Sequence, residues 1–362
     1  MIKTQTPTGD PAWLATDHAE VRRLLADERL GRSHPEPATA ARTGASALFG
    51  GPSGNFETEH ADHARMRSLL QPHFSPKRMR ALRPRIQALT TELLDKLTPP
   101  TDLHAELALP LPILVICELL GVPYEDRDQF RQWTQDAANT VDGTRSQQGL
   151  AALFGYGHEL VAKKRANPQD DVISQLAATE GVTDYEAATL SMTLLFAGHE
   201  TTVMQIGKGA MLLLDNPDQW QALVDDPSLV PNAVEEILRA PRAYANKGGG
   251  IPRYARTEMQ VGDATIHQGD LVLLSITAAN EDPAVFPDPE RVDVTRQTSA
   301  HLAFGHSIRY CLGAPLARIE LTEVFTQLVT RFPTMRLAVS SDDLVFNTDT
   351  LGSGLTALPV TW

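Results

Sequence analysis

The sequence predicts a mainly α-helical fold with small β-sheets, organised as a single domain over residues 1–362. Long apolar-patterned segments dominate the chain, and strand-like alternation is confined to residues 2–17 and 254–276. No repeat or low-complexity tract divides the sequence. With 362 residues, 42% of them hydrophobic, the chain is long enough to bury a large core.

The first elements are a hairpin and a short helix. Residues 2–6 and 12–17 are predicted strands around a turn that contains Pro and Gly, and residues 18–27 are an amphipathic helix. Residues 31–55 are rich in Gly, Ala, Ser and Pro and predict a long loop, which is typically functional or disordered. Helical segments then follow to about residue 165, with interruptions at Pro72, Pro76, Pro110, Pro112, Pro123 and Pro168.

The longest predicted helix begins after Thr183. Thr183 and Glu186 form a capping box, and no break signal follows before about Leu214. A helix of roughly 30 residues is about 45 Å long and must cross the whole domain. Two more helices are expected over residues 230–240 and 313–332.

Composition excludes several classes of protein. The net charge of −13 argues against nucleic acid as the main partner, since phosphate binding needs a basic surface. Two cysteines cannot build a disulfide framework, which favours a reducing, cytoplasmic location. Residues 1–10 lack the apolar core of a signal peptide, and no apolar run approaches the ~20 residues of a membrane span.

Cys311 lies in the segment FGHSIRYCLG, residues 304–313, and is the main candidate for chemistry. As a nucleophile it needs a base, such as His301 or His306, and an oxyanion hole, which the sequence does not exclude. A zinc site lacks a second nearby cysteine. A thiolate ligand of heme iron is the third interpretation, because a bent loop running into a helix supplies N–H groups and the positive end of the helix dipole. A buried apolar cysteine describes Cys117 better.

The loop resembles the heme-binding segment of bacterial cytochromes P-450, F-x-x-G-x-(H/R)-x-C-x-G. Phe304, Arg309, Cys311 and Gly313 match in register, and Ser307 replaces the family's glycine, which makes an unusual backbone turn. The resemblance implies the cytochrome P-450 fold, heme b (iron protoporphyrin IX) as cofactor, Cys311 as the iron ligand, and Phe304 and Gly313 at the cofactor.

The segment AGHETT, residues 197–202, resembles the family's oxygen-activating motif A-G-x-(D/E)-T. The resemblance implies that Glu200 and Thr201 relay protons through water in a locally opened helix, with Ala197 at the heme. The alternative is that the Thr201 hydroxyl only bonds back within its helix. The zinc motif H-E-x-x-H is excluded because Val203 stands at the second histidine.

Other family motifs follow in the expected order. Glu236 and Arg239 form E-x-x-R on one helical face and, with Arg291, are implied to be structural. Four residues are implied to bind the two heme propionates, because cations, and guanidinium groups above all, suit carboxylates. These are His63, Arg67, Arg253 and Arg309.

The resemblance covers nearly the whole chain. Family members usually carry a further helix before the first hairpin. Here Ile2 already lies in the first predicted strand, so either the start of the protein lies upstream or that helix is lacking. The implied activity is insertion of one oxygen atom from O2 into a small organic substrate, by hydroxylation or epoxidation, with electrons from a ferredoxin and its reductase. A secondary metabolite is the expected substrate. A heme-thiolate enzyme of oxidative coupling and a non-enzymatic heme sensor are the alternatives, although a sensor needs no proton relay.

Two surfaces are predicted from these assignments. The substrate pocket is expected to be lined by the 31–55 loop, the long helix and the glycines before Arg253. The residues predicted to line it are Leu195, Gly198, Gly249, Gly250 and Ile251. Gly248 precedes these glycines, and a merely flexible turn is the alternative for all three. A basic patch for an acidic ferredoxin is expected at Arg65, Arg67, Lys77, Arg78, Arg80, Arg83 and Arg85, a stretch without Asp or Glu.

Overall fold

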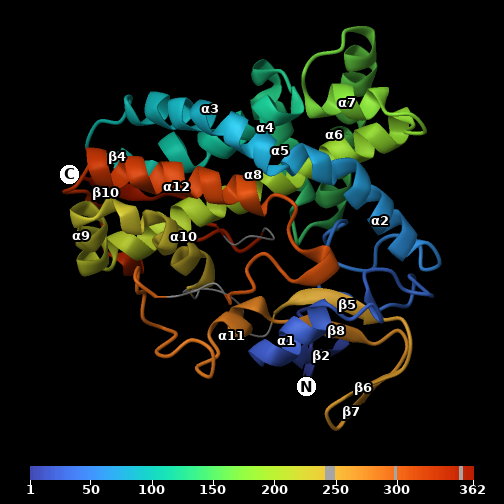
Figure 1. The fold of residues 1–362 in the computed structure, drawn as a ribbon. Helices are drawn as coiled ribbons and strands as arrows, with labels where there is room; N and C mark the ends of the chain where they lie inside the picture. Colours follow the sequence, from blue (N-terminus) through green and yellow to red (C-terminus); the bar gives the residue numbers. More distant parts are fainter. Residues whose placement is uncertain (241–248, 297–299, 350–353) are drawn as a thin grey trace.

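The computed structural model describes residues 1–240, 249–296, 300–349 and 354–362, and it confirms the mainly α-helical fold with small sheets. Figure 1 shows most of the helices together in one part of the molecule and the largest sheet, with α1 and α11, in another. The described helices are α1 (His18–Leu25), α2 (Glu59–Leu70), α3 (Pro76–Leu94), α4 (Pro110–Leu120), α5 (Arg127–Ala137), α6 (Gly143–Ala166), α7 (Val172–Ala178), α8 (Asp184–Leu214), α9 (Pro217–Asp225), α10 (Val230–Arg239), α11 (Ile276–Asn280) and α12 (Ala314–Arg331).

Helix α8 is the predicted central helix. It has 31 residues, and the Thr183 hydroxyl caps it by accepting a hydrogen bond from the Glu186 N–H at 3.1 Å. Helices α4, α6, α10 and α12 all pack against it. Leu190, Leu195 and Leu213 are buried on it, so α8 forms the axis of the main core.

A mixed sheet holds the N-terminal hairpin and the strands before α11. Its strands lie in the order β1-β2-β8-β5-β3, with β2 parallel to β8 and the other neighbours antiparallel. Two smaller sheets have the orders β4-β10-β9 and β6-β7. The strands are β1 (Ile2–Gln5), β2 (Pro11–Ala15), β3 (Leu30–Gly31), β4 (Thr101–Asp102), β5 (Ile251–Ala255), β6 (Met259–Val261), β7 (Ala264–Ile266), β8 (Leu271–Leu274), β9 (Arg336–Leu337) and β10 (Pro359–Thr361).

The long loop that the sequence predicted is present. The stretch from residue 32 to residue 58 has no regular element, as its composition indicated. Helix α12 packs along α3 and against α8 and α10, so the segment before Ala314 emerges among these helices (Figure 1). No helix within the described part of the chain is long and apolar enough to span a membrane.

Candidate active site

The loop before α12 turns twice through the left-handed region of backbone space. Gly305 has a φ of +73° and Ser307 a φ of +60°. The N–H of Cys311 closes the loop by donating to the Phe304 carbonyl oxygen at 2.8 Å. Ser307 therefore adopts the turn for which the family uses glycine, at a cost of roughly 1–2 kcal/mol for a residue with a Cβ atom.

The Cys311 side chain has exposed surface. The surrounding protein nevertheless withdraws solvent from the thiol and raises its pKa. Backbone N–H groups of Gly313 and Ala314, and the charges of Arg67 and Arg318, act in the opposite direction by stabilising a thiolate. The loop thus presents sulfur at the start of a helix, as the heme-ligand interpretation requires.

Arg318 braces this loop from α12. Its guanidinium donates to both carboxylate oxygens of Glu235, at 2.7 and 2.8 Å, and to the Tyr310 hydroxyl at 3.0 Å. The same guanidinium lies 4.5 Å from the centroid of the Phe304 ring. Phe304 is therefore held by Arg318 as well as by its place in the loop. The sequence motif pointed to Glu236, and nothing in the sequence indicated that the adjacent Glu235 binds Arg318.

The four residues predicted to bind propionates gather at one place. Burial and the charges of Arg309 and Arg67 lower the pKa of His63 to about 4. Burial and the charges of Arg309 and Arg32 lower the pKa of Arg253 to about 9. Burial is the larger cause of both shifts, and His63 is uncharged at neutral pH, while the arginines repel one another in a region that water screens poorly. An anionic group placed among them would relieve that repulsion.

Glu59 is the carboxylate that faces this group of cations. Its oxygens accept from the Arg32 N–H at 2.8 Å, from Arg256 at 3.3 Å and from Arg309 at 2.5 Å. Burial would raise the pKa of Glu59, but bonds from Ser33 and Arg32 and the charge of Arg309 hold it at about 2. One carboxylate thus faces several cations. Neither Glu59 nor Arg32 was predicted, because their partners are remote in sequence.

A cavity of about 610 Å³ lies where the 31–55 loop meets α8. The Arg32 guanidinium is 5.3 Å from the Phe49 ring, and Phe49 stacks on Phe196 of α8 at 6.0 Å. Phe49, Phe196 and Thr201 all line the cavity, so the predicted 31–55 loop does contribute to it.

Glu200 and Thr201 face this cavity from α8. The Thr201 hydroxyl donates to the Ala197 carbonyl oxygen at 2.9 Å, which is the back-bonded geometry of the alternative interpretation. Burial raises the pKa of Glu200, and Arg131 opposes that shift. The buried Oε1 of Glu200 has no hydrogen-bond partner in the described residues, and it lies 3.5 Å from Nδ1 of buried His199. Glu200 is therefore placed to hold a proton at the cavity wall.

The predicted pocket residues do not line this cavity. Leu195 is fully buried in the core, and a Cβ on Gly198 would lie 2.8 Å from Ile116, so both face the helices behind α8. A Cβ on Gly250 would lie 2.7 Å from the Leu274 backbone, and Ile251 pairs with Leu274. The end of this glycine run therefore serves close strand packing. Gly249 is described but lies in no strand, and Gly248 lies outside the described residues.

The buried charge cluster under α10 requires a correction. Arg239 donates to Glu236 at 2.7 and 2.8 Å, as the E-x-x-R motif predicted. The third member is Arg296, whose Nε is 3.3 Å from Glu236, and not Arg291. Arg291 is exposed, and its carbonyl oxygen accepts from Arg296. The backbone turn after Asp288, which has a φ of +48°, carries Arg291 outward and brings Arg296 in.

The predicted basic patch is largely neutralised. Arg65, Arg78, Arg83 and Arg85 form ion pairs with Glu186, Asp170, Glu323 and Glu118, respectively. Arg67 donates to the Tyr310 carbonyl oxygen. Lys77 and Arg80 are exposed, and no ion pair of either is found among the described residues.

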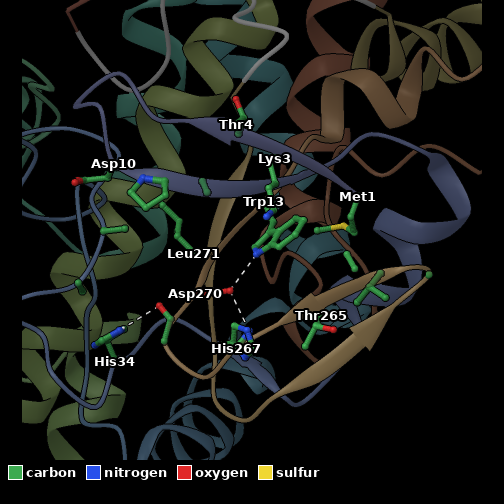
Figure 2. A pocket seen from close by; sticks show the side chains of 18 of the residues that line it. Met1, Lys3, Thr4, Asp10, Trp13, His34, Thr265, His267, Asp270 and Leu271 are labelled. Atoms are coloured by element: carbon green, nitrogen blue, oxygen red, sulfur yellow. Dashed lines mark hydrogen bonds between the residues drawn. The ribbon is translucent and has the colours of Figure 1, made fainter.

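A second hollow, of about 1100 Å³, lies between the two hairpins of the sheet region (Figure 2). Figure 2 shows Trp13 and His267 on either side of Asp270, whose carboxylate accepts from both, at 3.0 Å each. His34 closes another side through the Gly269 carbonyl oxygen. Neither Cys311 nor Thr201 lines this hollow, so it is separate from the candidate active site.

Comparison with known proteins establishes the family. The family model described as cytochrome P-450 matches residues 152–342. Pentalenolactone synthase of Streptomyces exfoliatus is 42% identical over 374 aligned residues, which cover 100% of this chain and 93% of that protein. Mycinamicin IV hydroxylase/epoxidase of Micromonospora griseorubida is 36% identical, with 99% and 92% covered. The structure of a substrate-free polyene macrolide antibiotic pimaricin epoxidase is 38% identical with a TM-score of 0.88, covering 100% of this chain and 92% of that one.

The chain belongs to the cytochrome P-450 family. It is a monooxygenase with a heme-thiolate cofactor. The residues fit that cofactor on two counts: an exposed cysteine sulfur at a helix start, and a group of mutually repelling cations facing one carboxylate.

Proposed function

We propose that this monooxygenase hydroxylates or epoxidises a small organic molecule of secondary metabolism, using heme b and electrons from a ferredoxin and its reductase. One observation carries the proposal. The cysteine loop and the cations at Glu59 connect, through Arg32 and Phe49, to the cavity that Thr201 lines. The hydroxylase and epoxidase relatives support the reaction class.

Each residue of the site has a defined task. The heme, when bound, activates dioxygen for insertion of one oxygen atom into the substrate. Cys311 holds the iron through its thiolate, which Gly313 and Ala314 stabilise. His63, Arg67, Arg253 and Arg309 bind the propionates. Phe49 and Phe196 exclude water around the substrate.

Two residues of α8, Glu200 and Thr201, deliver protons. Glu200, whose pKa is raised by burial, holds a proton near neutral pH more readily than an exposed carboxyl group does. The Thr201 hydroxyl satisfies its own donor at Ala197 and keeps its acceptor lone pairs free for a water in the cavity. The two side chains are neighbours in sequence and both line the cavity, so Glu200 supplies the proton and Thr201 positions the water that carries it.

The test is product analysis under isotope-labelled dioxygen with ferredoxin, its reductase and NADPH. A panel of terpenoid and macrolide precursors, first screened for the Soret shift of substrate binding, supplies the substrate. One labelled oxygen atom in the product is the expected result. A coupled product without the label would identify the oxidative-coupling alternative. Heme extraction with acidified butanone checks heme b, which leaves the protein because it is not covalently attached.

A further inference from the structure

Arg131 is a half-buried cation on the cavity side of α5. Arg131 and Gln135 lie one turn apart on α5 and both line the cavity, so one face of α5 opens onto it; Asn139, just after the helix, lines it as well. Phe130 and Thr134 on the same helix point into the core and are buried. The polar face of α5 stands across the cavity from Phe196 and Thr201 of α8.

The guanidinium of Arg131 has no acidic partner among the described residues. Arg145, the other arginine at this cavity, is neutralised by Asp136, with Nε 2.6 Å from Oδ1. Glu200 and Asp349 line the same cavity, but neither carboxylate is within ion-pair distance of Arg131 in the described part of the chain. Arg131 therefore adds a positive charge without an ion-pair partner among the described residues to a cavity lined by both polar and apolar side chains.

The charge of Arg131 affects the pKa values of neighbouring groups. Burial lowers the pKa of His199 to about 3, and Arg131 adds to the effect. Arg131 also disfavours the charged form of His104 and partly offsets the effect of burial on Glu200. The charge of Arg131 thus acts on His104 and Glu200, which both line the cavity.

We infer that the substrate is an amphipathic carboxylic acid whose carboxylate is bound by Arg131 and whose hydrocarbon part lies against Phe49 and Phe196. This inference rests on the proposed function, because it concerns the molecule that enters the same cavity. A guanidinium offers a carboxylate two parallel N–H donors, and the half-burial of Arg131 strengthens that charge-assisted pair. A cavity of about 610 Å³ has the size of a site for one small molecule.

An alternative role for Arg131 is to pair with Glu200 during proton delivery. The two roles differ in what they require of the ligand. A substrate-binding Arg131 discriminates an acid from its ester, whereas an Arg131 that serves Glu200 treats both alike.

The test measures binding to the heme-loaded protein by isothermal titration calorimetry and, in parallel, by the Soret shift. The probes are dodecanoic acid and abietic acid, each beside its methyl ester. The wild type, Arg131→Gln and Arg131→Lys are compared with Arg127→Gln. Arg127 is the matched control, because it lies one turn away on α5, pairs with Asp128 and does not line the cavity.

The wild type is expected to bind at least one acid about 10- to 100-fold more tightly than its ester, as a charge-assisted pair implies. Arg131→Gln removes this preference, Arg131→Lys retains part of it, and Arg127→Gln leaves it intact. An acid-to-ester ratio that is equal in the wild type and Arg131→Gln overturns the inference, as does a wild type that binds neither acid.

Failure of the proposed function gives a different result. Arg131-dependent binding of an acid by calorimetry without a Soret shift would support the carboxylate site and contradict its position beside the heme. Oxygenation of neutral substrates at a rate independent of Arg131 would support the monooxygenase and overturn the inference.

Discussion

Arg67 of α2 donates a hydrogen bond from its guanidinium to the carbonyl oxygen of Tyr310, at 2.7 Å. Tyr310 immediately precedes Cys311, and its hydroxyl accepts from Arg318 on the other side. The cysteine loop is therefore fixed between two arginines from different helices. Loss of Arg67 would alter the loop as well as a propionate contact, so Cys311 itself is the cleaner target for a test.

Cys311→Ser is expected to abolish the red-shifted Soret band of the reduced, carbon-monoxide-bound protein, because a hydroxyl does not replace the thiolate ligand. The control is Cys117→Ala, which removes the other cysteine, a buried one on α4. It should retain the band. A normal band in Cys311→Ser would show that another residue binds the iron.

Ser307→Gly should stabilise the protein by about 1 kcal/mol, because glycine adopts a φ of +60° without a clash of the Cβ atom. The measurement is the free energy of unfolding in urea. Ser340→Gly is the control, since Ser340 has an ordinary φ of −65° and gains only unfolded-state entropy from the change. Equal effects of the two substitutions would contradict the strain at Ser307.

Arg296→Gln should destabilise the protein by roughly 2–4 kcal/mol, because it removes a cation from buried Glu236 and a donor from the Pro287 and Asp288 carbonyl groups. Arg291→Gln, at an exposed position, should change stability by less than about 0.5 kcal/mol. Thermal unfolding of both variants checks the assignment. A larger loss of stability in Arg291→Gln than in Arg296→Gln would support Arg291 as the partner of Glu236 instead.

Thr201→Ala should leave heme content and substrate affinity intact while the fraction of NADPH recovered as product falls on the order of ten-fold, with peroxide formed instead. The matched control is Thr193→Ala. Thr193 lies about two turns earlier on α8, is exposed, and makes the same back-bond, to Thr189. Loss of coupling in both variants would attribute the effect to the back-bond and not to proton delivery.

The ion pairs of Glu235 predict a pH dependence of stability. Burial would raise the pKa of Glu235, but bonds from Arg318 and His301 lower it to about 2 from 4.5. The stabilisation is therefore present above pH 4.5 and is lost as the pH falls toward 2. Glu235→Gln should flatten the fall in unfolding free energy across this range, whereas Glu57→Gln, at an exposed loop position, should not. An unchanged pH profile in Glu235→Gln would exclude this contribution.

Local signals predicted the parts of the structure that local physics determines. The capping box at Thr183 gave the start of α8, because its two partners are three residues apart. The cysteine loop could also be predicted from the sequence, since the order of residues from Phe304 to Gly313 defines its turns.

Contacts between residues that are far apart in the sequence could not be predicted from such local signals. Arg309 pairs with Glu59 across 250 positions, and no periodicity marks that pair. The family resemblance placed Arg291 beside Glu236, because a motif does not show which way the chain turns after Asp288. Helical periodicity likewise leaves open which face of α8 meets the cavity, and Leu195 and Gly198, which were predicted at the substrate pocket, do not line the cavity of about 610 Å³.

The group of cations around Glu59 links the cellular level of this protein to its cofactor supply. Burial, together with the charges of Arg309 and Arg32, lowers the pKa of Arg253 to about 9, and a dianionic ligand would stabilise its charged form. A ligand that binds only the folded chain raises its stability by mass action, so newly made chains resist proteolysis in proportion to available heme. Iron limitation would therefore reduce the amount of intact enzyme through degradation, without any change in its synthesis.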